Sequence, residues 1–193
     1  MKTTVTEPRP ITDYQGLSPE ELFRRTAEAK RALGDRVMIL GHNYQRDEVI
    51  EHADFRGDSL LLSKLAAERS ERPYIVFCGV HFMAETADIL SRSKQTVILP
   101  DMDAGCSLED SCPPDQFKAF RAAHPDHIAL TYINCSTEVK ALSDIIVTSS
   151  SAEKILAQLP ADQKIIFGPD KHLGGYLSRK MGREMLLWPG VCI

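Results

Sequence analysis

Short apolar runs alternate with longer amphipathic segments along most of this chain. The short runs are typical of buried strands, and the segments between them have the spacing of helices. Strands are predicted at residues 37–40, 75–78, 96–99, 127–133, 144–147 and 164–167, and helices at residues 19–33, 60–68, 82–90, 114–123, 152–159 and 173–181. A polar, short helical stretch is also expected between the first strand and Asp58. This alternation predicts an α/β fold of three-layer αβα units, in which helices cover both faces of short parallel sheets.

Local signals mark where several of these helices begin. Ser18, with Glu21 three residues later, forms a capping box, and Gly34 follows the last turn of the same helix. Asp58-Ser59 and the run of serines at residues 149–151 stand just before two later helices and can cap them.

The second half of the chain repeats the order of elements in the first half. Aligning the two halves pairs His42 with Asn134, Ser59 with Ser149, Gly79 with Gly168 and Cys106 with Cys192. We therefore predict an N-terminal extension at residues 1–19 and two α/β units of one design, at residues 20–105 and 106–193.

Several polar residues stand just after predicted strands, where open parallel sheets bind their ligands. Two of them, Ser59 and Ser149, stand at helix starts, whose backbone N–H groups attract carboxylates and phosphates. This pair favours a small ligand with several negative charges, although each serine taken alone is more often only a cap. The residues that could line one cleft between the units are His42, Tyr44, Ser59, Tyr132, Asn134, Ser149, Cys106 and Cys192.

Charge and composition exclude several classes of partner. A net charge of −4 gives no support for a general binder of nucleic acid or anionic membranes. No apolar run approaches the ~20 residues of a membrane span, and the N-terminal residues lack the apolar core of a signal peptide, so a cytoplasmic protein is expected. Dinucleotide and nucleotide-triphosphate motifs and a nucleophile elbow are also missing from the sequence.

The five cysteines fall into two groups. No pair has Cys-x-x-Cys spacing, which argues against a zinc ribbon or finger. Cys78, inside an apolar run, is expected to be a small core residue, as free cysteine usually is. Cys106 and Cys192 differ, because each ends its half of the repeat.

Six motifs in a fixed order resemble the quinolinate synthase family, the iron–sulfur enzymes of NAD biosynthesis. The resemblance covers the chain from about residue 20 to its end. The motifs are Gly-His-Asn-Tyr-Gln at 41–45, Gly-Asp-Ser-Leu at 57–60, Phe-Cys-Gly-Val-His-Phe-Met-Ala-Glu-Thr-Ala at 77–87, Ala-Gly-Cys-Ser-Leu at 104–108, Tyr-Ile-Asn-Cys-Ser-Thr-Glu-Val-Lys at 132–140 and Phe-Gly-Pro-Asp at 167–170.

The resemblance implies three pseudo-symmetric α/β units around a central site, each giving one cysteine to a 4Fe-4S cluster. Cys106 and Cys192 take two of these ligand positions, whereas Cys78, Cys112 and Cys135 take none. Three thiolates leave one iron without a protein ligand, and that iron can act as a Lewis acid. The implied reaction condenses iminoaspartate (iminosuccinate) with dihydroxyacetone phosphate, with loss of phosphate and water, to give quinolinate.

The resemblance also implies roles for single residues. His42 and Ser59 would bind the dicarboxylate, and Tyr132, Asn134 and Ser149 would complete its binding site. Tyr44 would move protons on the triose-derived part, a task that His42 could share. L-aspartate oxidase is the expected supplier of iminosuccinate.

The chain ends one residue after Cys192, so the family's third unit and third cysteine are expected to be missing. A cluster held by two thiolates would be weak, and the 193-residue chain alone is expected to be inactive. Two alternatives remain open. One is a non-enzymatic α/β module that binds small dicarboxylates or phosphate without a cluster, and the other, with little support from spacing, is a zinc protein.

Overall fold

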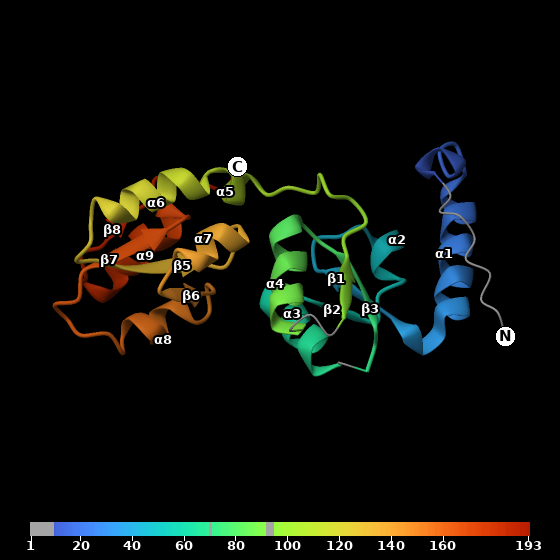
Figure 1. Cartoon of the computed structure of the whole chain (residues 1–193), viewed down its shortest axis with the longest axis horizontal. Helices are drawn as coiled ribbons and strands as arrows, with labels where there is room; N and C mark the ends of the chain where they lie inside the picture. The colour runs from blue at the N-terminus through green and yellow to red at the C-terminus, as the bar shows by residue number, and fades with distance from the viewer. Residues whose placement is uncertain (1–9, 70, 92–94) are drawn as a thin grey trace.

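Two four-stranded, all-parallel sheets form the framework of the computed structural model, which describes residues 10–69, 71–91 and 95–193 (Figure 1). We call α1–β4 the first unit: α1 (Pro19–Leu33), β1 (Val37–His42), α2 (Asp47–Ile50), β2 (Phe55–Gly57), α3 (Ser59–Glu68), β3 (Tyr74–Cys78), α4 (His81–Ser91) and β4 (Thr96–Ile98). We call α5–β8 the second unit: α5 (Ser107–Asp110), α6 (Pro114–Ala122), β5 (Ile128–Tyr132), α7 (Thr137–Ala141), β6 (Ile145–Val147), α8 (Ala152–Leu156), β7 (Ile165–Gly168), α9 (Lys171–Met181) and β8 (Leu186–Leu187). Short 3-10 helices, Ile11–Asp13 and Gly34–Arg36, flank α1.

The two sheets have the same strand order, β2-β1-β3-β4 in the first unit and β6-β5-β7-β8 in the second. The predicted α/β fold with parallel sheets flanked by helices is therefore confirmed. The part of the predicted N-terminal extension at residues 1–9 lies outside the described residues.

The first helix begins as its sequence predicts. The Ser18 hydroxyl oxygen accepts a hydrogen bond from the Glu21 N–H at 3.2 Å, and Pro19 is the first helical residue. The helix ends at Gly34, whose φ of 55° lies in the region that favours glycine. Local chemistry at both ends therefore fixes the length of α1.

Four short elements are not predicted from the sequence: β2, β8, α5 and α7. β2 contains three residues and β8 contains two, too few to show the two-residue period of a half-buried strand. These strands are defined by their partners, since Phe55 pairs with Leu40 and Leu187 pairs with Phe167. The predicted helix at residues 152–159 is shorter than expected, because α8 ends at Leu156.

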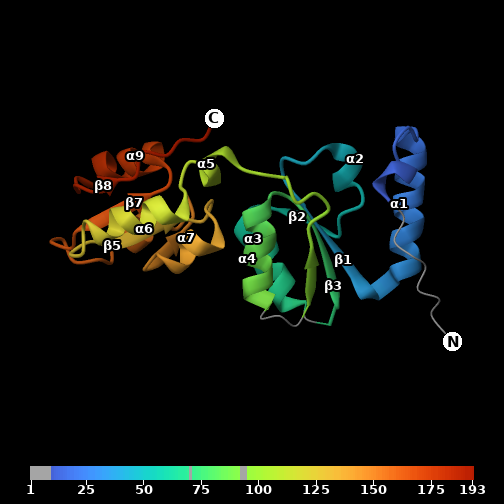
Figure 2. The same ribbon diagram turned by 45° about the horizontal axis from the view of Figure 1, so that its top comes forward.

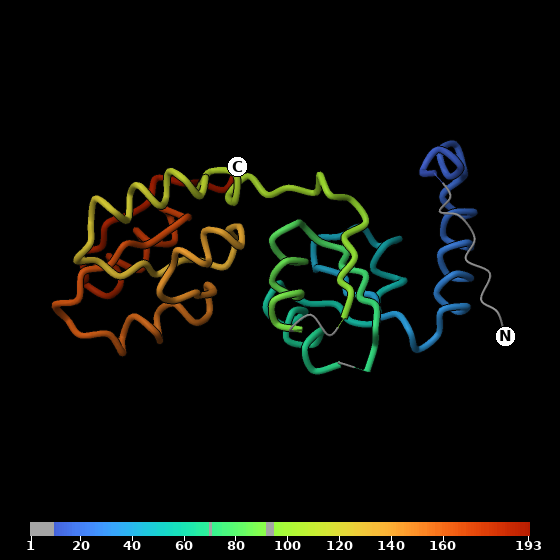
Figure 3. The backbone as a smooth tube through the Cα atoms, viewed as in Figure 1, coloured from blue at the N-terminus to red at the C-terminus, as the bar shows by residue number. Residues whose placement is uncertain are grey.

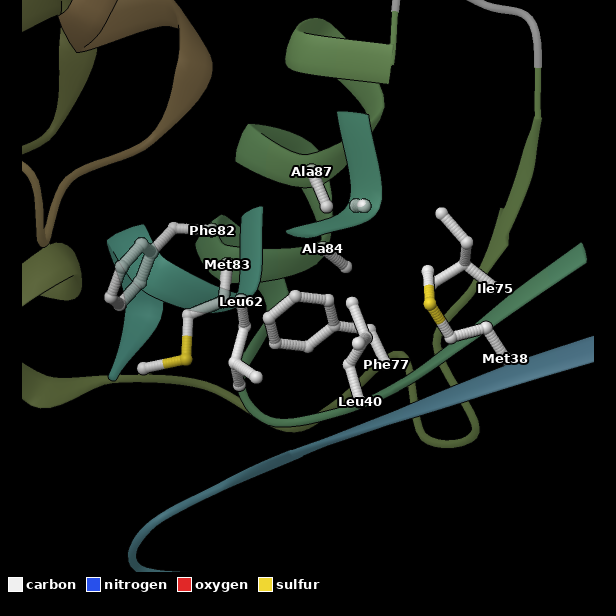
Figure 4. Close-up of a cluster of buried hydrophobic side chains, with 10 residues drawn as sticks. Met38, Leu40, Leu62, Ile75, Phe77, Phe82, Met83, Ala84 and Ala87 are labelled. Carbon is white, nitrogen blue, oxygen red and sulfur yellow. The ribbon is translucent and has the colours of Figure 1, made fainter. Parts of the chain in front are cut away.

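Alternate residues of β1 and β3 build the core of the first unit. Met38, Leu40, Ile75 and Phe77 point to one face of the sheet, where they meet Leu62 of α3 and several residues of α4 (Figure 4). The opposite face lies toward α1, which stands on that side of the sheet (Figure 2). A cavity of about 430 Å³, lined mainly by apolar side chains, separates α1 from β1 and β3.

The second unit has a buried cluster on each face of its sheet. One cluster includes Phe117 of α6 and Trp188, whose ring centroids are 5.6 Å apart in an edge-on arrangement. The other places Leu130 and Phe167 of the sheet against α8 and α9. The central sheet with a helix layer on each face is the three-layer arrangement predicted from the sequence.

The strand registers show how the two units correspond. Leu40 pairs with Phe55 in the first unit, and the residues 90 positions later, Leu130 and Ile145, pair in the second. The same separation relates Asp54, whose carboxylate accepts the Ile39 N–H at 2.8 Å, to Asp144, which accepts the Ala129 N–H at 2.7 Å. A basic side chain from the helix before β1 or β5 pairs with each aspartate, Lys30 of α1 with Asp54 and Arg121 of α6 with Asp144.

This register corrects two of the pairings read from the sequence. His42 pairs with Gly57 and Tyr132 pairs with Val147, so the counterpart of His42 is Tyr132 and not Asn134. The counterpart of Gly168 is likewise Cys78 and not Gly79, because these two residues end the equivalent pairs of β1–β3 and β5–β7. Both wrong pairings came from matching residue types, whereas the strand register keeps the same 90-residue separation from Leu40 and Leu130 to Phe77 and Phe167.

In the described part of the chain, the helices are all too short or too polar to cross a membrane.

We expect the two units to unfold as separate bodies, because each of the three buried clusters draws its buried residues from one unit. Phe77→Ala should destabilise the first unit by about 3–5 kcal/mol, since it removes a fully buried ring. Trp188, the one tryptophan of the chain, reports on the second unit. In urea, Phe77→Ala should shift part of the circular dichroism transition and leave the midpoint of Trp188 fluorescence in place.

The equivalent variant Phe167→Ala serves as the control and should shift the fluorescence midpoint. Equal shifts of both signals in Phe77→Ala would mean that the units unfold together.

Candidate functional site

A cleft of about 250 Å³ lies between the two units, at the carboxyl ends of β2, β5 and β6. Its first wall is the start of α3, residues 58–61 and 64, and its second wall consists of residues 132–134 and 148–150. Four residues singled out from the sequence line this cleft: Ser59, Tyr132, Asn134 and Ser149. Strands far apart in the sequence thus bring these polar groups to one place, as parallel sheets do.

Ser59 is the first residue of α3 rather than its cap. The cap is Asp58, whose carboxylate accepts the Leu61 N–H at 2.9 Å. The Ser59 hydroxyl therefore has no capping role, and the residue is 8% exposed at the edge of the cleft. The N-terminus of this ten-residue helix carries a partial positive charge that favours an anion.

Ser149 lies in the turn after β6 and does not begin a helix. The N-cap of α8 is Ser151, whose hydroxyl oxygen accepts the Thr148 N–H instead of an N–H of the helix. The prediction of two equivalent helix starts around the ligand is therefore correct for Ser59 and wrong for Ser149. The serine run forms a turn closed by its own side chains, because short polar side chains compete with the helix for nearby backbone groups.

Tyr132 joins the cleft to the cysteines. Burial raises the pKa of the Tyr132 phenol, and the nearby Asp170 and Cys106 add to the effect. A hydrogen bond with Ser149 acts in the opposite direction, and it gives the serine a partner within the cleft wall. Tyr132 remains a protonated phenol that can donate a hydrogen bond at neutral pH.

The rings of His42 and Tyr44 pack against each other at a tilt of 39°, and neither residue lines the cleft. Their ring centroids are 4.1 Å apart, and the Tyr44 N–H lies 3.4 Å from His42 Nδ1. Burial lowers the pKa of His42, although the charge of Asp58 opposes this. The imidazole is therefore neutral at pH 7, and with Nδ1 as acceptor its proton is placed on Nε2.

The Tyr44 hydroxyl lies close to Met83, with 3.8 Å between the oxygen and the sulfur. Burial raises the pKa of this phenol and Cys106 adds to the shift, so Tyr44 is protonated at neutral pH. The residue is 53% exposed, which leaves it accessible to a ligand.

The two predicted ligand cysteines occupy equivalent places. The Ala104 carbonyl accepts the N–H of His81, the first residue of α4, and the Gly190 carbonyl accepts that of Lys171, the first residue of α9. Cys106 and Cys192 each follow two residues later, which confirms their pairing in the repeat. Only glycine fits at residue 190, because a Cβ there would overlap the Pro169 carbonyl oxygen.

The ends of the two units also bring these cysteines near each other. The N–H of Ile193, the residue after Cys192, donates to the hydroxyl of Ser107, the residue after Cys106, at 3.1 Å. Cys106 is half-buried and Cys192 is exposed, and both act on the pKa of Tyr132. The structure therefore places two thiols beside one end of the candidate site.

Comparison with known proteins identifies the family. The family model described as Quinolinate synthetase A protein matches residues 24–193. The chain belongs to the quinolinate synthase family.

A quinolinate synthase of Chloroherpeton thalassium is 54% identical over 176 residues, which cover 91% of this chain and 53% of that protein. One from Nostoc punctiforme is 51% identical over 193 residues, which cover 100% of this chain and 58% of that protein. The chain thus spans about half the length of the curated relatives that it matches.

Burial separates Cys106 and Cys192 from Cys112 and Cys135. Burial raises the pKa of both Cys112 and Cys135 to about 12, so these two remain neutral thiols in the core. Cys78 is partly buried, and burial raises its pKa as well. The expectation that these three are not ligands agrees with their surroundings, since thiolates are the form that binds metal.

One polar group between the units is not predicted from the sequence. His81, Glu85 and Glu109 place ligand atoms within 4.8 Å of one another, the one such group of three that we find in the described residues. The spacing of His81 and Glu85, four residues apart on a helix, was a signal for part of it. Lys64, an exposed lysine in the second turn of α3 that lines the cleft, is likewise not predicted from the sequence.

Alkylation should separate the cysteines into the two groups described here. With iodoacetamide at pH 8, Cys192 should react first and Cys106 more slowly, in line with their exposure. Cys112 and Cys135 should stay unmodified until urea is added, because they are buried and their thiols are protonated at this pH. Peptide mass spectrometry measures each site, and rapid labelling of Cys112 or Cys135 in the folded chain would contradict this assignment.

Proposed function

We propose that this chain forms part of a quinolinate synthase, which condenses iminosuccinate with dihydroxyacetone phosphate and releases phosphate, water and quinolinate. The observation that carries the proposal is the cleft between the units, which joins Ser59 to Tyr132, Asn134 and Ser149 in a chain of this family. The active protein has the full length of the relatives, and L-aspartate oxidase supplies its iminosuccinate.

The cleft has the groups that a dicarboxylate needs. The N-terminus of α3 and the Lys64 ammonium offer positive charge to the carboxylates. The side chains of Ser59 and Asn134 offer hydrogen-bond donors from opposite walls. A ligand that reaches both walls bridges the two units.

His42 and Tyr44 are suited to proton transfer on the triose-derived part of the substrate. The neutral imidazole carries a proton on Nε2, and the Tyr44 phenol is protonated, so either group can donate to a carbonyl or a leaving oxygen. The tilted packing of the two rings holds the imidazole and the phenol side by side.

Cys106 and Cys192 would hold two positions of a 4Fe-4S cluster, which supplies a Lewis-acid iron when it is bound. The third thiolate comes from the part of the relatives' length that this chain does not match. Tyr132 is close enough to both cysteines for them to act on its pKa, and it would lie between the cluster and the dicarboxylate.

The enzyme reading is tested on the endogenous protein, isolated without oxygen in the longest form that cells make. Native mass spectrometry should show the mass of four irons and four sulfides, and the protein should convert iminosuccinate and dihydroxyacetone phosphate into quinolinate. Cys106→Ser should abolish both signals, whereas Cys78→Ser, the matched control at a half-buried cysteine outside the site, should keep them. Full iron content in Cys106→Ser would contradict the ligand assignment, and a protein without a cluster that still binds dicarboxylates would favour a non-enzymatic binding module.

The binding residues are tested by calorimetry with quinolinate as the probe. Asn134→Ala and Ser59→Ala should each weaken binding about tenfold or more, since each removes a hydrogen bond to a charged group. Ser91→Ala, at the far end of α4, is the control and should leave the affinity unchanged. Affinity that stays at the wild-type level in both cleft variants would place the dicarboxylate elsewhere.

A further inference from the structure

The buried clusters of the described residues are not shared between the two units, so the relative orientation of the units depends on something other than a common core. Each buried cluster takes its buried residues from one unit, and an extended segment leads from β4 to α5 (Figure 3). The cleft takes one wall from each unit, and its width therefore depends on how the units are held together.

The contact that holds them lies between α4 and α7, which face each other across the boundary (Figure 1). The Glu85 carboxylate of α4 accepts the N–H of Thr137, the first residue of α7, at 3.1 Å. Within the described residues this is the one hydrogen bond that we find between the units. It places a negative charge at a helix N-terminus, where unpaired N–H groups favour it.

Lys140 adds a second connection in the opposite direction. Its ammonium lies 5.2 Å from the ring centroid of Phe82 on α4, within range of a cation–π interaction, and donates a hydrogen bond to the Cys135 carbonyl. The same ammonium is close enough to Glu85 and Glu109 for their charges to act on its pKa, which burial lowers. Lys140 thus supplies a positive charge to the acidic group formed with His81.

We propose that Glu85 and Lys140 are positioning residues, which fix the angle between the units and hold Asn134 and Tyr132 opposite Ser59. Asn134 is followed directly by Cys135, whose carbonyl Lys140 binds, and three residues after Asn134 stands Thr137, whose N–H Glu85 binds. The cleft wall is therefore tied on its C-terminal side to the first unit. The inference rests on the proposed function only for the identity of the ligand.

The orientation is measured without any ligand, by NMR on the ¹⁵N-labelled chain. In the wild type the Thr137 amide should exchange slowly and both units should show one rotational correlation time. Glu85→Ala should speed Thr137 exchange about tenfold or more and give the units separate, shorter correlation times, because the hydrogen bond and its charge are lost. Lys140→Met, which keeps the apolar stem, should also separate the correlation times.

Matched variants exclude general effects of charge and folding. Glu85→Gln keeps an oxygen acceptor for the Thr137 N–H and should restore much of the protection against exchange. Asp88→Asn removes a charge from an exposed position one turn further along α4, and Lys118→Met does so on α6, so both should behave like the wild type. Wild-type exchange at Thr137 and a single correlation time in Glu85→Ala would overturn the inference.

Quinolinate calorimetry then tests whether the orientation matters for binding. Glu85→Ala should bind the probe about tenfold more weakly, and Glu85→Gln should regain most of that loss. Separate correlation times with unchanged affinity would overturn the positioning role. A wild-type chain that shows the slow Thr137 exchange but does not bind quinolinate would contradict the proposed function and leave the role of Glu85 in orienting the units supported.

Discussion

Parallel pairing of the strands is the constraint on which the rest of this structure depends. A parallel pair needs a crossover between its strands, so the helices are placed on the sheet faces and all strands end at the same edge. An aspartate stands at the end of the first crossover in each unit, Asp54 after β1 and Asp144 after β5. Its carboxylate accepts an N–H of that strand and pairs with a basic side chain of the helix before that strand, α1 or α6. The same device in both units fixes the register that brings the polar residues to one edge.

Local sequence signals predicted the elements that are long enough to carry them. The capping box predicted α1, and the apolar runs predicted β1, β3, β5 and β7, because in each case the signal lies within the element itself. β2 and β8 depend on pairing with distant strands, and α7 is a short helix whose first N–H is bound by Glu85 of another element. No period within such short segments reveals them.

The sequence predicted which residues form the cleft better than it predicted how they are arranged. Ser59, Tyr132, Asn134 and Ser149 meet in the cleft, but the register makes Tyr132 the counterpart of His42, and of the predicted cap Asp58-Ser59 only Asp58 caps α3. Similar residue types one or two positions away from the true counterpart misled the alignment, and only the strand pairing fixes the separation of 90 residues. Lys64 was missed because an exposed lysine on a helix is ordinary until the facing wall is known.

The polar character of the contact between α4 and α7 has a thermodynamic consequence. Unfolding either unit exposes apolar surface to water and carries the large positive heat-capacity change of such exposure. Rotating one unit away from the other breaks a hydrogen bond and a cation–π contact and leaves the three buried clusters intact, because each draws its buried residues from one unit. A rotation that widens the cleft is therefore expected to carry a much smaller heat-capacity change than unfolding, and its van't Hoff plot is expected to be close to a straight line over temperatures at which the stability curve of each unit bends strongly.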